Sequence, residues 1–119
     1  MFLRPTPTLG KVLIMQKPIS GLSSKNNSRV VSILSQYPAV EKAILYGSRA
    51  MGNYKAGSDI DLTLQGSNLS HHEIFQIATA FDESMLPYMV DLSILDHIEN
   101  QDLLQHIKRV GVVAYERGG

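Results

Sequence analysis

Two acidic residues at the start of a predicted strand constrain the fold of this chain more than any other feature. Asp59 and Asp61 close the glycine-punctuated stretch GSRAMGNYKAGSDIDL, and from Asp59 to Leu64 polar and apolar residues alternate. A period of two is typical of a β-strand that is buried on one face only. Residues two apart in a strand project to the same side, with α-carbons about 6 to 7 Å apart. The chain is therefore expected to build a sheet with one apolar face and one face that carries both carboxylates.

These two carboxylates indicate a cation site. Like charges at this spacing raise the pKa of one group or destabilise the fold unless a cation lies between them. The chain has no cysteine, and oxygen ligands favour Mg²⁺ or Mn²⁺. Nearby, Gly47 lets the backbone approach a ligand closely, Ser48 offers a hydroxyl to phosphate oxygens, and Arg49 adds a guanidinium that would neutralise phosphate charge. A metal beside a phosphate clamp indicates phosphoryl or nucleotidyl transfer.

The remaining sequence predicts a small α+β domain. Helices are expected where apolar residues recur at helical spacing behind a capping residue, and strands where they alternate or form short runs. The expected order is helix 23–37, strand 43–46, strand 60–64, helix 70–85, strand 88–95, helix 100–110 and strand 112–116. This order predicts a small mixed sheet with helices packed on one face, which leaves the other face open for a site.

Length and composition limit the domain organisation. A chain of 119 residues suits one domain. Residues 1–19 are rich in proline and are expected to form a disordered extension, so residues 20–119 form the predicted domain. The apolar run at 12–15 is too short for a membrane span. Eleven basic residues balance eleven acidic ones, so no direct nucleic-acid binding is expected, and the lack of cysteine fits the cytoplasm.

A third acid completes the predicted metal site. Asp91 lies in the middle of the strand expected at 88–95, on its polar face. In a two-metal site a third carboxylate holds the ion that activates the attacking hydroxyl. We therefore predict Asp59, Asp61 and Asp91 as metal ligands and catalytic residues.

The combined motif resembles that of the DNA polymerase β-type nucleotidyltransferase superfamily. Its elements are Gly47-Ser48, ten intervening residues, Asp59-Ile60-Asp61 and a later strand aspartate. Within the superfamily, the stretch YGSRAMGNYKAGSDIDLTL is similar to the minimal nucleotidyltransferases (MNT), small proteins often encoded beside a HEPN-type helical partner. In the familiar form of this loop a second arginine stands where this chain has Met51, which leaves the role of that arginine open.

The resemblance implies roles for individual residues. Asp59 and Asp61 would bind both metal ions, and Asp91 would bind the catalytic ion and activate the acceptor hydroxyl. The nucleotide-phosphate clamp would include Gly47 and Ser48, and the full set of predicted nucleotide-binding residues is Gly47, Ser48, Arg49 and Ser58.

The expected activity is transfer of a nucleoside monophosphate, with ATP as the expected donor, two Mg²⁺ or Mn²⁺ ions and release of pyrophosphate. Only 28 residues follow Asp91, which leaves no room for a domain that presents an acceptor. The acceptor hydroxyl is therefore expected on another chain. The resemblance favours a HEPN-like partner, with this protein as the antitoxin of a toxin–antitoxin pair.

Two other classes of function remain open. The same fold would serve as a non-catalytic binding module that neutralises a partner by contact alone. It would also serve as an enzyme that modifies a small molecule such as an antibiotic, with its pocket at a homodimer interface. Replacement of Asp59 and Asp61 by asparagine would separate contact from catalysis, because a purely steric partner would retain its effect.

Overall fold

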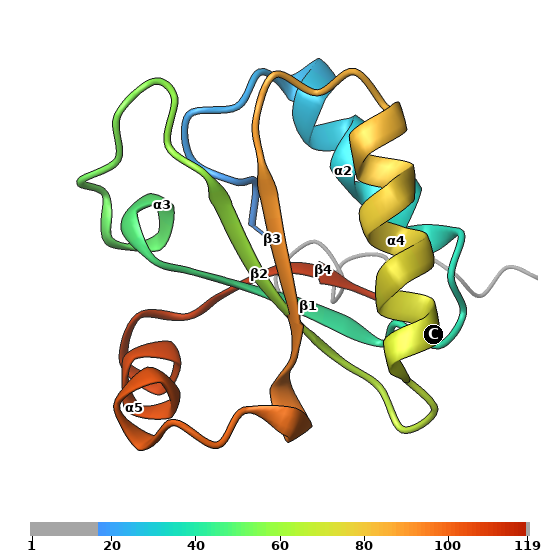
Figure 1. Ribbon diagram of the computed structural model, residues 1–119. Coiled ribbons are helices and arrows are strands. Elements are labelled where there is room, and N and C mark those ends of the chain that lie inside the picture. The colour runs from blue at the N-terminus through green and yellow to red at the C-terminus, as the bar shows by residue number, and fades with distance from the viewer. Residues whose placement is uncertain (1–16, 119) are drawn as a thin grey trace, which may run out of the picture.

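The computed structural model describes residues 17–118, and they form a mixed four-stranded sheet with helices beside it (Figure 1). The helices are α2 (Ser24–Ser35), α3 (Ser48–Met51), α4 (His71–Glu83), the 3-10 turn η1 (Leu95–His97) and α5 (Gln101–Val110). The strands are β1 (Lys42–Tyr46), β2 (Ile60–Gln65), β3 (Val90–Ile94) and β4 (Val112–Glu116), in the spatial order β3-β2-β1-β4. The predicted α+β class and the predicted element order are confirmed.

The strand pairing follows from the connections. β1 and β2 are consecutive and antiparallel, with Tyr46 opposite Asp61. The α4 crossover returns the chain so that β3 lies parallel to β2, as expected for a strand–helix–strand unit. β4 pairs antiparallel with the other side of β1, where the register shifts between Ala43 and Ile44. β3 and β4 are thus the outer strands.

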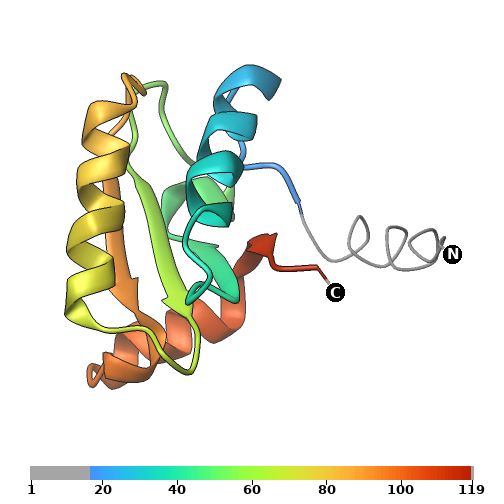
Figure 2. The same cartoon turned by 90° about the vertical axis from the view of Figure 1, so that its right-hand side faces the viewer.

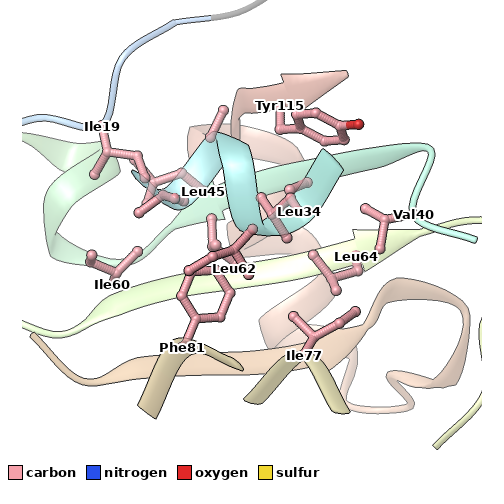
Figure 3. Close-up of a cluster of buried hydrophobic side chains, with 14 of the residues drawn as sticks. Ile19, Leu34, Val40, Leu45, Ile60, Leu62, Leu64, Ile77, Phe81 and Tyr115 are labelled. Carbon is pink, nitrogen blue, oxygen red and sulfur yellow. The ribbon is translucent and has the colours of Figure 1, made fainter. Parts of the chain in front are cut away.

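The hydrophobic core lies between one face of the sheet and the helices α2 and α4, which lie side by side (Figure 2). Leu62 and Leu64 of β2 are fully buried there, with Leu34 of α2 and Ile77 of α4 (Figure 3). The alternation seen in the sequence thus places the leucines of β2 in the core and Asp61 on the opposite face.

Capping residues define where the helices begin. The Ser23 hydroxyl accepts the Asn26 N–H (3.1 Å) at the start of α2, and Asn100 Oδ1 accepts the Leu103 N–H (3.0 Å) at the start of α5. The predicted capping box at α4 is present, and Glu73 accepts the Ser70 N–H (3.0 Å). Such caps satisfy backbone N–H groups that have no partner inside the helix.

One helix departs from the predicted one-sided arrangement. In α5, Leu104 and Ile107 line a groove together with Ile44 of β1. Ile44 points to the same face as Tyr46 and the aspartates, because residues two apart in a strand share a face. α5 therefore covers part of the face that the sequence leaves open.

The predicted boundary between the N-terminal extension and the domain, at residue 19, lies too far along the chain. The Lys17 N–H donates to the Val113 carbonyl of β4 (2.9 Å). Ile19 is 2% exposed within the core, and its N–H donates to Asn27 Oδ1 (3.0 Å). The domain thus begins before residue 20, and the remainder of the predicted extension, residues 1–16, lies outside the described residues. Among the helices of residues 17–118, none has the length and apolar character that a bilayer crossing requires.

Candidate active site

Three aspartates lie at neighbouring positions of β2 and β3. Asp61 and Asp91 are register partners in the parallel strand pair, so their side chains leave the sheet from the same face. Asp59 directly precedes β2. At the next residue, the Ile60 N–H donates to the Met89 carbonyl (2.9 Å), which is the first hydrogen bond between β2 and the segment that leads into β3. The structure thus brings together the three acids that the sequence singles out.

The electrostatics of Asp61 reflect this arrangement. Burial raises the pKa of Asp61, and the negative charges of Asp91 and Asp59 raise it further. His106 acts in the opposite direction and lowers the pKa of Asp61. A carboxyl whose ionised form is disfavoured by its own neighbours is typical of a functional site.

The donor set of this cluster fits a hard cation. All three side chains offer carboxylate oxygens, the ligands that Mg²⁺ and Mn²⁺ prefer, and a cation would relieve the repulsion that raises the pKa of Asp61. Over residues 17–118, no three His, Asp or Glu side chains already stand in a metal-binding arrangement. Ion binding would therefore require the aspartate side chains to turn towards one another.

Gly47 occupies a position that only glycine suits. It ends β1 with a φ of 75° and forms the N-cap of α3, a backbone conformation that L side chains rarely adopt. A Cβ at this position would collide with Oδ2 of Asp61. The glycine therefore allows the Asp61 carboxylate to lie directly against the turn that leads into Ser48.

Ser48 is the first residue of the short helix α3. Its hydroxyl has no hydrogen-bond partner within the described part of the chain. By contrast, the Gly47 N–H already donates to Nε2 of His106 (3.1 Å). The backbone donor that the sequence assigns to phosphate at Gly47 is thus occupied, and Ser48 is the member of the predicted pair whose side chain remains available.

The nucleotide-binding role predicted for Arg49 does not fit its place in the structure. Arg49 is 1% exposed. Its guanidinium donates to the carbonyls of Ser58 (2.8 and 3.1 Å), Ala56 (3.4 Å) and Ser20 (2.7 Å). It also lies over the rings of Tyr54 and Tyr88, at 5.1 and 4.7 Å from their centroids. Arg49 therefore fastens the loop before β2 to the rest of the domain.

Ser58 also stabilises that loop. Its hydroxyl accepts the Lys55 N–H (2.8 Å) and its carbonyl accepts the Arg49 guanidinium. Ser58 directly precedes Asp59, so these bonds fix the backbone from which the first aspartate projects.

Two residues of the site were missed by the sequence analysis. Tyr46 is the register partner of Asp61, and its ring meets that of His106 edge-on, with centroids 6.1 Å apart. Burial raises the pKa of Tyr46, a hydrogen bond with Ser93 lowers it, and Asp91 and Asp61 raise it. Tyr46 directly precedes the predicted Gly-Ser clamp, which was a usable signal. His106 lies far along the chain in α5 and carries no such signal.

The raised pKa of Asp61 predicts an unusual pH dependence of stability. Between the ordinary pKa of an aspartate and the raised value, the folded state binds more protons than the unfolded state, so stability falls as pH rises through this window. We expect the free energy of unfolding of metal-free protein to increase on acidification from neutral pH into this window. Urea unfolding over a pH series in a chelator measures it.

The Asp61→Asn variant is the control for this pH series. Elsewhere, Glu73 has a pKa lowered by hydrogen bonds from Ser70, so its contribution to stability is lost as pH falls from the ordinary pKa of a glutamate through the lowered value. Both proteins retain Glu73, and the difference between their curves isolates Asp61. Identical pH slopes in the two proteins would contradict the raised pKa of Asp61 that burial and the neighbouring acids produce.

Comparisons with known proteins agree with this fold. A family model described as polymerase beta, nucleotidyltransferase, matches residues 28–118. No curated protein matches the sequence significantly. Among solved structures, a chain of a toxin–antitoxin complex with AMP-PNP is 21% identical, with a TM-score of 0.63 over 77% of this chain and 74% of that chain.

Two further solved structures have the same fold. A chain from the complex of a tri-AMPylated Shewanella oneidensis HEPN toxin with an MNT antitoxin is 18% identical, with a TM-score of 0.60 over 81% of this chain and 74% of that chain. A chain of the MntA-HepT toxin–antitoxin complex is also 18% identical, with a TM-score of 0.58 over 80% of this chain and 74% of that chain. At these identities the likeness concerns the fold.

Proposed function

Because the chain belongs to the polymerase beta nucleotidyltransferase family, we propose that it transfers a nucleoside monophosphate, AMP from ATP, to a hydroxyl group of a partner protein. The observation that carries this proposal is the placement of Asp61 against the Gly47 turn and beside its register partner Asp91, where the charges of Asp91 and Asp59 add to burial in raising the pKa of Asp61. Gly47 has no side chain to collide with the Asp61 carboxylate and directly precedes Ser48, so a carboxylate and a serine lie at the same turn, as binding of a metal–triphosphate substrate requires.

The proposed reaction assigns a role to each group. Bound Mg²⁺ or Mn²⁺, in two ions held by Asp59, Asp61 and Asp91, would supply charge stabilisation for the attacking and leaving oxygens. The Ser48 hydroxyl binds a phosphate oxygen of the nucleotide. The acceptor hydroxyl oxygen attacks the α-phosphorus while the bond from that phosphorus to the β-bridging oxygen breaks, and pyrophosphate leaves. Asp91 accepts the hydroxyl proton.

A protein partner is the proposed acceptor. Structures that share this fold come from toxin–antitoxin complexes, and one of them contains an AMPylated HEPN toxin. By analogy, we assign this chain the antitoxin role beside a HEPN-like toxin.

Label transfer tests this proposal. The protein is incubated with Mg²⁺ and α-labelled ATP, CTP, GTP or UTP, alone and with the product of the adjacent gene. We expect label on the partner from ATP, and none when the chain carries Asp59→Asn. Absence of both nucleotide binding and transfer with all four nucleotides would overturn the proposal in favour of a module that acts by contact alone.

A further inference from the structure

His106 connects the last helix to the turn that carries the predicted phosphate-binding serine. Its Nε2 accepts the Gly47 N–H (3.1 Å). The ring nitrogen thus serves as the acceptor for a backbone donor at the end of β1. The ring also meets Tyr46 edge-on, with centroids 6.1 Å apart. One side chain of α5 thus contacts both Tyr46, the last residue of β1, and Gly47, which begins the turn.

The turn at Gly47 needs such a contact. Glycine has more conformational freedom than any other residue, and Gly47 adopts a φ of 75° directly before Ser48. Its carbonyl is held by the N–H groups of Ala50 (3.1 Å) and Met51 (3.0 Å). The N–H group of Gly47 in turn donates to Nε2 of His106. The conformation of the glycine is thus fixed from both sides, once by α3 and once by α5.

The helix that carries His106, α5, is itself held in place by a capping residue and by a buried side chain. The helix begins at an Asn100 cap, and Ile107, next to His106, is 5% exposed against β1. A side chain on a packed helix holds its partner more tightly than one on a loop.

We propose that His106 is a positioning residue for the nucleotide site: it fixes the Gly47 turn so that Ser48 meets the nucleoside triphosphate in a preformed arrangement. This inference rests on the proposed function, because it assigns the support of the same nucleotide site. Loss of the histidine acceptor leaves the Gly47 N–H without its partner and frees the turn. Nucleotide binding then includes the cost of ordering that turn.

Three variants test the proposal. His106→Phe keeps an aromatic ring beside Tyr46 and removes the acceptor, and His106→Gln keeps an acceptor at the reach of Nε2. Gln105→Ala, at an exposed position of the same helix, is the matched control. Each is compared with the wild type by calorimetric titration with a non-hydrolysable ATP analogue in Mg²⁺, and by amide hydrogen exchange at Gly47.

We expect about tenfold weaker nucleotide binding for His106→Phe, the effect of one lost hydrogen bond on a partly buried donor. His106→Gln should recover most of the affinity, Gln105→Ala should bind like the wild type, and kcat at saturating nucleotide should change little. Amide exchange at Gly47 should accelerate in His106→Phe. Reversible unfolding would also weaken the apparent affinity, so the titrations are made under conditions in which urea unfolding shows every variant to be folded.

The outcomes separate this inference from the proposed function. Equal or tighter binding by folded His106→Phe would overturn the inference alone, because the histidine would then compete with phosphate for the Gly47 N–H. If His106→Phe does not fold, equal binding by His106→Gln with a fast-exchanging Gly47 amide in the wild type would overturn it. A wild type that binds no nucleotide would overturn the proposed function, and this inference with it.

Discussion

Replacement of Asp61 by asparagine is expected to reduce nucleotidyl transfer by about a thousandfold or more, because metal-assisted charge stabilisation is worth several kcal/mol at the transition state. Asp61 is the central acid of the cluster, flanked by the charges of Asp91 and Asp59 and packed against Gly47. Asparagine has nearly the same shape but lacks the charge that a divalent ion requires. Initial rates with saturating nucleotide and partner measure the change.

Asp82→Asn is the matched control for this substitution. Asp82 is exposed in α4, the helix that packs on the other face of the sheet, and its loss should leave transfer unchanged. The Asp61→Asn protein should also unfold at a higher urea concentration than the metal-free wild type, because one like charge is gone. Transfer at more than about a tenth of the wild-type rate would contradict the assignment of Asp61 as a metal ligand.

Replacement of Arg49 by methionine is expected to lower the free energy of unfolding by about 3 to 5 kcal/mol. Hydrogen bonds to charged groups contribute about 1.5 to 3 kcal/mol each, and several are lost together with incomplete additivity. The guanidinium joins Ser58 of the motif loop, Ser20 of the N-terminal segment and the ring of Tyr88 before β3. Methionine fills similar space but donates nothing. Urea unfolding measures the loss.

Two further variants define what Arg49 contributes. Arg49→Lys retains the charge without the planar fork of donors and should fall between the wild type and Arg49→Met. Arg109→Met, at an exposed position of α5, should change stability by no more than about 0.5 kcal/mol. If Arg49→Met unfolds at the same urea concentration as Arg109→Met, the guanidinium does not fasten the loop.

Periodicity made the strands and helices of this fold predictable. The alternation from Asp59 to Leu64 indicated which side chains of β2 enter the core, and Leu62 and Leu64 are indeed fully buried. The role of Ile19 was not predictable in this way, because a single apolar residue between polar ones has no period. Its burial depends on contact with core residues from distant parts of the chain.

For the candidate site, local spacing identified the acids but not the residues around them. Asp61 lies in β2 and Asp59 directly precedes this strand, two residues away, so the sequence alone predicted that they lie close together. His106 contacts Gly47 only because α5, near the end of the chain, packs beside β1. No motif in the sequence around His106 predicts this contact. Arg49 illustrates the same limit, since a guanidinium next to a phosphate motif suits an anion and a set of backbone carbonyls equally well.

The outer position of β3 has a consequence for how acceptors are selected. Among residues 17–118, the strand that carries Asp91 has a neighbour on one side only, so Asp91 lies at an edge of the sheet. Asp91 is also exposed, so an acceptor group that reached it as proposed would approach from the surface of the domain. Discrimination between correct and incorrect acceptors would then depend on the fit of two surfaces, and changes of specificity would arise by substitutions on the rim without any rebuilding of the core.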